Sequence, residues 1–175
     1  PIVDLTAELH RRHFDTQLHT AWLDEETGVA VFPLWNLSGQ MRGYQQYRPS
    51  TTVKKNNDPK ESRYYSYMVE PAWWGFESWK LSPGLLFVTE GVFDAARLTA
   101  RGVSAIATLS NDPGKNFKNF VFTCGRRVVT VCDNDENGSG RKLAKYGHQS
   151  VFCEDGKDLG DSSEKYVDFL LRKFT

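Results

Sequence analysis

Acidic motifs follow three apolar, β-like runs in the second half of this chain. Residues 85–89 precede Glu90, residues 127–132 precede Asp133 and Asp135, and residues 150–153 precede Asp158 and Asp161. We expect these runs to be parallel strands, whose carboxyl ends meet at one edge of an open α/β sheet. Asp133 and Asp135 are two residues apart, so in extended chain both carboxylates point to the same side. The pattern therefore predicts a cluster of carboxylates.

Carboxylates that gather without partners repel one another, so at least one would have a raised pKa unless a cation neutralised them. Mg²⁺ is the natural cation, because it prefers oxygen ligands and keeps several waters. A calcium loop of the EF-hand type is excluded, because its twelfth position, counted from Asp133, is Ala144, which supplies no carboxylate. We therefore expect a magnesium site suited to phosphate chemistry.

The order of these motifs resembles the Toprim family, which includes primases, topoisomerases and some nucleases. The resemblance covers about residues 85–161 and is carried by Glu90-Gly91-x-x-Asp94, Asp133-x-Asp135 and Lys157-Asp158. Residues 29–35 and 41–48, and Trp74-Gly75-Phe76, resemble the segment that precedes the Toprim domain in primase cores. Topoisomerases and small Toprim nucleases are not expected to carry that segment, so the resemblance favours a primase.

The resemblance implies an α/β fold, α+β overall, in which a Toprim parallel sheet with flanking helices follows a small basic mixed α/β subdomain. We expect the subdomain to span residues 1–84 and the Toprim domain residues 85–175. It also implies a DNA primase core that makes short RNA primers on a single-stranded DNA template from nucleoside triphosphates. Such a core would use two Mg²⁺ or Mn²⁺ ions and work with a replicative helicase or another replication protein.

Site roles follow from the same resemblance. The expected catalytic residues are Glu90, Asp133 and Asp135, and the expected metal ligands are these three with Asp94, Asp158 and Asp161. Asp94 has an ordinary alternative, because an acid in the first turn of a helix is favoured by the helix dipole. Asp161 has one too: Asp161-x-x-Glu164 before an apolar helix is typical of a capping box, and for Asp161 we favour the cap.

Basic residues concentrate in one stretch, although the chain has 22 basic and 22 acidic residues and no net charge. Residues 40–65 carry six basic and two acidic residues, a net charge of +4. The expected contacts to phosphate or nucleic acid are Arg42, Tyr47, Arg48, Lys54, Lys55, Arg63 and, in the third acidic motif, Lys157. Aromatic residues between such bases can stack on nucleobases. The alternative is an ordinary solvated loop.

Composition bears on membrane contact, zinc binding and the cellular compartment. With 39% hydrophobic residues and no apolar run long enough to span a bilayer, we expect no membrane contact. Three cysteines without a Cys-x-x-Cys pair argue against a zinc ribbon and for a reducing compartment. We expect a cytoplasmic protein, in the bacterial host cytoplasm if it is phage-encoded.

Two other functions fit the acidic motifs. A Toprim nuclease would cut RNA or DNA with the same carboxylates, but the basic stretch argues against it. A non-catalytic module would only dock nucleic acid or a replication protein, but it would not need clustered, self-repelling carboxylates.

Helices and strands must hold these motifs in place. Leu5 and Leu9, four residues apart, predict a helix over residues 2–13. Aromatic and branched residues on both sides of a Ser-Gly turn predict a hairpin of strands over 28–35 and 40–48, and a third strand is expected over 64–68. From residue 85 onward, strands alternate with helices over 95–101, 115–123, 141–146 and 163–174, with a further strand over 104–109. Such alternation is typical of a mainly parallel sheet covered by helices.

Overall fold

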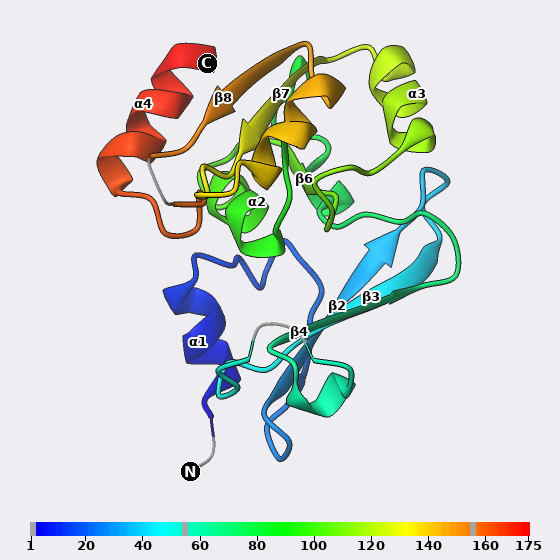
Figure 1. Ribbon diagram of the computed structural model, residues 1–175, viewed down its shortest axis with the longest axis vertical. Coiled ribbons are helices and arrows are strands. Elements are labelled where there is room, and N and C mark those ends of the chain that lie inside the picture. The colour runs from blue at the N-terminus through cyan, green and yellow to red at the C-terminus, as the bar shows by residue number, and fades with distance from the viewer. Residues whose placement is uncertain (1–2, 54–55, 155–156) are drawn as a thin grey trace. The chain divides into compact units, whose positions relative to one another are not determined.

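The computed structural model describes residues 3–53, 56–154 and 157–175, which form two compact units, Pro1–Trp74 and Gly75–Thr175 (Figure 1). We expected the boundary after residue 84. Residues 75–84 belong to the second unit because the hydroxyl of Ser78 donates to the carbonyl of Ala105 at 3.1 Å and accepts from its N–H at 3.0 Å. This pair of hydrogen bonds fixes the segment to a strand of the parallel sheet.

The first unit is built on an antiparallel sheet in the order β1-β2-β3-β4. Its strands are β1 (Trp22–Asp24), β2 (Val29–Trp35), β3 (Met41–Tyr47) and β4 (Tyr64–Met68), with helix α1 (Leu5–Arg11) before them and the 3-10 turn η1 (Pro59–Glu61) before β4. The sequence predicted β2, β3 and β4 well. Helix α1 is shorter than expected and begins where the Asp4 side chain accepts the N–H of Ala7.

Aromatic rings fill the core of the first unit. Phe14 stacks on Phe32 of β2 with ring centroids 5.0 Å apart, and it contacts Trp74 at 5.6 Å. Leu5 and Leu9, one turn apart on α1, are fully buried. Burying these large apolar groups is the main favourable term for folding.

The second unit contains a parallel sheet in the order β6-β5-β7-β8 (Figure 1). The strands are β5 (Leu85–Thr89), β6 (Ala105–Ala107), β7 (Arg127–Cys132) and β8 (Gln149–Phe152). All five residues of β5 are buried, because this strand lies between two others and its faces are covered.

Helices α2 (Val92–Thr99), α3 (Lys115–Thr123) and α4 (Glu164–Phe174) connect and follow these strands, together with the 3-10 segments η2 (Phe76–Ser78) and η3 (Ser139–Tyr146). The Phe174 ring of α4 meets the Phe87 ring of β5 edge-on at 5.9 Å. Residues 141–146, expected to be α-helical, lie in η3 instead. The predicted fold class, mixed α/β with a parallel sheet in the second half, is confirmed. Among the described residues, no helix is long and apolar enough to cross a membrane.

Candidate active site

The carboxyl ends of three parallel strands carry the acidic motifs, as expected. Glu90 directly follows β5, Asp133 directly follows β7, and Asp158 lies in the loop after β8. The strands are in register at this edge, where Cys132 of β7 pairs with Phe152 of β8. The motifs therefore leave the sheet at one edge.

Asp94 is the most buried carboxylate of the site. It lies in the first turn of α2 and is only 5% exposed. Burial raises the pKa of Asp94 well above its ordinary range, and the charges of Asp158 and Asp133 raise it further. Hydrogen bonds from the N–H groups of Gly160 and Gly91 partly oppose this rise in pKa. Three of the predicted metal ligands therefore lie within electrostatic reach of one another.

Gly91 makes room for the Asp94 carboxylate. A Cβ at Gly91 would lie 2.8 Å from Oδ2 of Asp94, closer than such atoms normally approach. The backbone of Gly91 has φ −93° and ψ 151°, which any residue can adopt. The requirement for glycine is therefore one of space at the carboxylate.

Two buried thiols also respond to these charges. Burial raises the pKa of Cys132 to about 11, and the carboxylates of Asp133 and Glu90 contribute to the rise. Burial likewise raises the pKa of Cys153, with contributions from Asp94, Asp133 and Asp158. The negative field of the acidic motifs thus converges on the ends of β7 and β8.

Asp135 is turned toward its own chain. Its Oδ2 accepts a hydrogen bond from the hydroxyl of Ser139 at 2.9 Å, at the start of η3. The residue between the two acids, Asn134, contacts the third motif instead: its N–H donates to the carbonyl of Lys157 and its side-chain amide to that of Cys153. Sequence reasoning missed this role of Asn134, although an amide between two acids was a visible signal.

The third motif forms a tight turn. Oδ1 of Asp158 accepts the N–H of Asp161 at 2.9 Å, and the carbonyl of Asp158 accepts the hydroxyl of Ser162 at 2.7 Å. The side chain of Lys157 is exposed. Our preference for Asp161 as a helix cap was wrong: α4 begins at Glu164, and the hydroxyl of Ser163 accepts the N–H of Tyr166.

The donor set suits a hard cation. It consists of carboxylate oxygens whose repulsion a divalent ion would relieve. Within residues 3–53, 56–154 and 157–175, no three His, Cys, Asp or Glu side chains are already arranged to hold an ion. Mg²⁺ seldom needs such a cage, since it commonly binds through one or two carboxylates together with waters and substrate phosphates. In their chemistry, these carboxylates therefore suit a divalent ion that is held by few protein ligands.

The basic residues of the first unit are mostly engaged in local contacts. Nε of Arg42 pairs with Glu70 at 2.8 Å. Arg48 donates to the carbonyl of Pro59 at 2.7 Å, and Arg63 donates to that of Thr51 at 2.9 Å. The last two side chains thus hold the loop between β3 and β4. Lys54 and Lys55 lie outside the described residues.

Tyr47 is buried, with 2% of its surface exposed. Its ring stacks on Tyr64 with centroids 5.3 Å apart, and its hydroxyl donates to Glu8 at 2.9 Å. Its pKa rises to about 12, first because of burial and then because of the Glu8 hydrogen bond. In this position its ring offers no face to a nucleobase, whereas Tyr67, which contacts Tyr44, is half exposed.

Comparison with known proteins supports the fold. No protein-family model matches this chain, and neither does any curated protein. The structure is similar to the Escherichia coli primase catalytic core, with 18% identity and a TM-score of 0.60 over 83% of this chain and 52% of that chain.

It is also similar to the RNA polymerase domain of the Mycobacterium tuberculosis primase DnaG, with 20% identity and a TM-score of 0.60 over 98% of this chain and 65% of that one. The primase fragment of the bacteriophage T7 primase-helicase protein matches with 15% identity and a TM-score of 0.54, over 83% and 60% of the two chains. This chain spans about half the length of the E. coli core, 52%. Its fold is therefore that of DNA primase catalytic cores.

Proposed function

We propose that this chain is the catalytic core of a DNA primase, a nucleotidyltransferase that makes short RNA primers on single-stranded DNA. The observation that carries the proposal is the set of carboxylates at the strand ends, where burial first and then the charges of Asp158 and Asp133 raise the pKa of Asp94. The fold of primase cores supports it, and one similar structure is a DnaG primase catalytic domain bound to single-stranded DNA. The resemblance of the acidic motifs to the Toprim family agrees with the carboxylate cluster and with the fold.

In this proposal, Asp133 and Asp158 hold Mg²⁺ or Mn²⁺, as two ions, together with the triphosphate. When bound, the ions would activate the attacking 3′-hydroxyl and neutralise charge on the leaving pyrophosphate. The Glu90 carboxylate would contribute a ligand or accept the proton of the 3′-hydroxyl. Asp135 would join this set after releasing Ser139, and Asp94 would orient the third motif through Gly160.

The exposed ammonium of Lys157 would contact substrate phosphate. The basic stretch that contains Arg42, Arg48 and Arg63 would hold the template backbone, which is bound chiefly through charge. A replicative helicase or another replication protein is the proposed partner, because one similar structure belongs to a primase-helicase protein.

A primer-synthesis assay tests this function. It combines single-stranded DNA, labelled ribonucleoside triphosphates and Mg²⁺ or Mn²⁺, with the wild type beside Asp133→Asn. Asp168→Asn is the matched control, because this carboxylate pairs with Arg101 on the surface. We expect short labelled products from the wild type and the control alone.

Three other results would contradict the proposal. Full activity in a chelator would exclude the metal mechanism. Degradation of a labelled strand without nucleotide addition would indicate a nuclease. Nucleic-acid binding that Asp133→Asn leaves unchanged, without chemistry under any metal, would indicate a docking module.

A further inference from the structure

Helix α2, whose eight residues are all buried, carries one basic residue, Arg97. Arg97 lies three positions after Asp94, and the side chain of Arg97 is only 6% exposed. Residues three apart lie on the same side of a helix. A buried arginine keeps its charge, so it needs hydrogen-bond acceptors around it.

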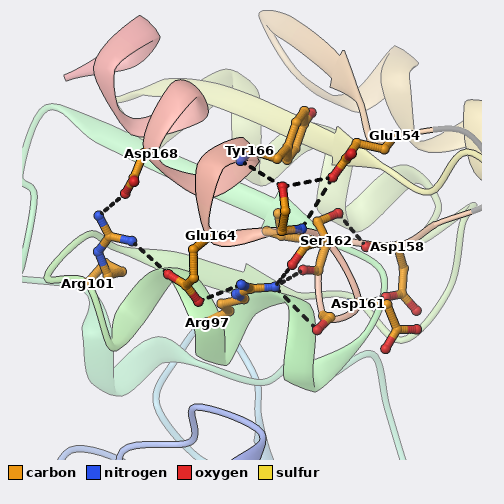
Figure 2. A network of polar contacts seen from close by, with 12 residues as sticks. Arg97, Arg101, Glu154, Asp158, Asp161, Ser162, Glu164, Tyr166 and Asp168 are labelled. Atoms are coloured by element: carbon orange, nitrogen blue, oxygen red, sulfur yellow. Dashed lines mark hydrogen bonds and ion pairs between the residues drawn. The ribbon is translucent and has the colours of Figure 1, made fainter.

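The acceptors come from the loop that carries the third acidic motif (Figure 2). One guanidinium nitrogen of Arg97 donates to the carbonyls of Leu159 at 3.0 Å, of Gly160 at 3.4 Å and of Ser162. The second terminal nitrogen, Nη2, donates to the carboxylate of Glu164 at 2.6 Å, at the start of α4. A single side chain thus binds three backbone carbonyls of one short segment between Asp158 and α4.

Asp94, on the same helix, holds this loop at a second point. The N–H of Gly160 donates to Oδ1 of Asp94 at 2.7 Å. Helix α2 therefore binds the loop at two points, through an acceptor at Asp94 and a donor at Arg97. Because the Asp158 carboxylate is itself bonded within this turn, to the N–H of Asp161, fixing the turn also fixes the carboxylate.

We propose that Arg97 is a positioning residue for the reaction, because it holds the turn of residues 158–162 and so aims the Asp158 carboxylate toward the metal. The inference rests on the proposed function, since it assumes that Asp158 binds the metal. Arg97 does not touch substrate. Groups that orient a metal ligand commonly change metal affinity by about 10- to 100-fold when removed.

Arg101 provides a matched control just beyond the same helix, two residues after its last residue, Thr99. It lies one turn further along and pairs with Asp168 at 2.6 Å and Glu164 at 3.5 Å (Figure 2). Its side chain is partly exposed, and the interactions described for it involve no backbone carbonyl of the loop. Losing Arg101 removes a surface charge from the same network and leaves the hydrogen bonds from Arg97 to the turn in place.

Two readouts that do not depend on catalysis test the inference in the full chain. The first is Mn²⁺ binding, followed through the electron paramagnetic resonance signal of free Mn²⁺. The second is the rate of tryptic cleavage after Lys157, which reports directly on the order of the loop. Arg97→Met, Arg97→Lys and Arg101→Met are compared with the wild type, with thermal unfolding measured for each.

We expect Arg97→Met to weaken Mn²⁺ binding about tenfold or more and to speed cleavage after Lys157. Arg97→Lys should keep part of the Mn²⁺ affinity and part of the resistance to cleavage, because an ammonium can reach some of the carbonyls. Arg101→Met should bind Mn²⁺ as the wild type does. A folded Arg97→Met that matches the wild type in both readouts would overturn the inference, and if this variant does not fold, Arg97→Lys decides by the same two readouts.

Failure of the proposed function gives a different result. In that case the wild type itself binds no Mn²⁺, or Asp133→Asn binds it equally well. The cleavage rate then still decides whether Arg97 holds the turn. A change in thermal unfolding with unchanged Mn²⁺ affinity and unchanged cleavage would show that Arg97 is only structural, and would also overturn the inference.

Discussion

The N–H of Gly160 donates a hydrogen bond of 2.7 Å to the carboxylate of Asp94 and so joins the first acidic motif to the third. Asp94 is buried, and an unpaired buried carboxylate is costly. The bond offsets part of that cost and brings Asp158, two residues earlier in the loop, near the same helix. This contact turns two sequence motifs into one site.

Gly91→Ala should damage the site and leave the fold largely intact. The added Cβ would lie 2.8 Å from Oδ2 of Asp94, so the carboxylate must move, while the backbone at this position suits alanine. Small displacements at a reacting centre can cost up to about 100-fold in rate. We expect primer synthesis to fall about 10- to 100-fold with little change in Tm.

Gly84→Ala is the control for this substitution. A Cβ at Gly84 would meet no atom within 4 Å, so both activity and Tm should remain near the wild type. If Gly91→Ala were fully active, the close packing around Asp94 would have no part in the reaction.

Asp94 should also make stability depend on pH when no metal is present. Its pKa in the folded state is raised, first by burial and then by Asp158 and Asp133, above the unfolded value of about 4. The folded state therefore binds the proton more tightly, and its stability falls as the pH rises from about 4 toward the folded pKa. Above that pKa, the stability that protonated Asp94 contributes to the folded state is lost completely.

Thermal unfolding in a chelator, measured across this pH range, checks the sign. Asp94→Asn should flatten the dependence, because an amide does not titrate. Asp168→Asn, at a surface ion pair, should keep the wild-type slope. A wild type whose stability rises over the same range would show that Asp94 does not control it.

Divalent metal should stabilise the folded state by binding to the carboxylates. Binding at 100 times the dissociation constant adds about 2.7 kcal/mol to the free energy of unfolding. We expect Mn²⁺ to raise the Tm of the wild type and of Asp168→Asn, and a chelator to reverse the rise. Asp133→Asn should lose most of the effect, and an equal rise in that variant would place the metal elsewhere.

Local patterns predicted much of the fold. The strands β2, β3 and β4 and the helix α3 lie within a residue or so of their expected ranges. For β2 and β3 the signal was composition, because aromatic and branched residues lie on both sides of a Ser-Gly turn. Strand β1 was not predicted, since three residues give too short a pattern. Residues 141–146 were expected to be α-helical but lie in a 3-10 segment that starts where Gly138 adopts a positive φ.

The site was predictable only as far as strand ends determine it. Spacing indicated that Glu90, Asp133 and Asp158 leave the sheet at one edge. It did not indicate that Asp135 binds Ser139, because a hydroxyl four residues away in the sequence competes with a metal ion for this carboxylate. Nor did it indicate Arg97, whose acceptors lie more than sixty residues away in the chain.

The start of α4 provides a last prediction, since two residues compete for the cap in the sequence. The Ser163 hydroxyl accepts the N–H of Tyr166 at 3.1 Å and also contacts Glu154 at 3.2 Å. Ser163→Ala should therefore lower the free energy of unfolding by about 1 kcal/mol, the usual cost of losing an N-cap. Asp161→Ala should change it little, because the Asp161 backbone N–H, which donates to Asp158, remains. Denaturant unfolding of both variants decides between them, and a larger loss in Asp161→Ala than in Ser163→Ala would show that Asp161 is the cap.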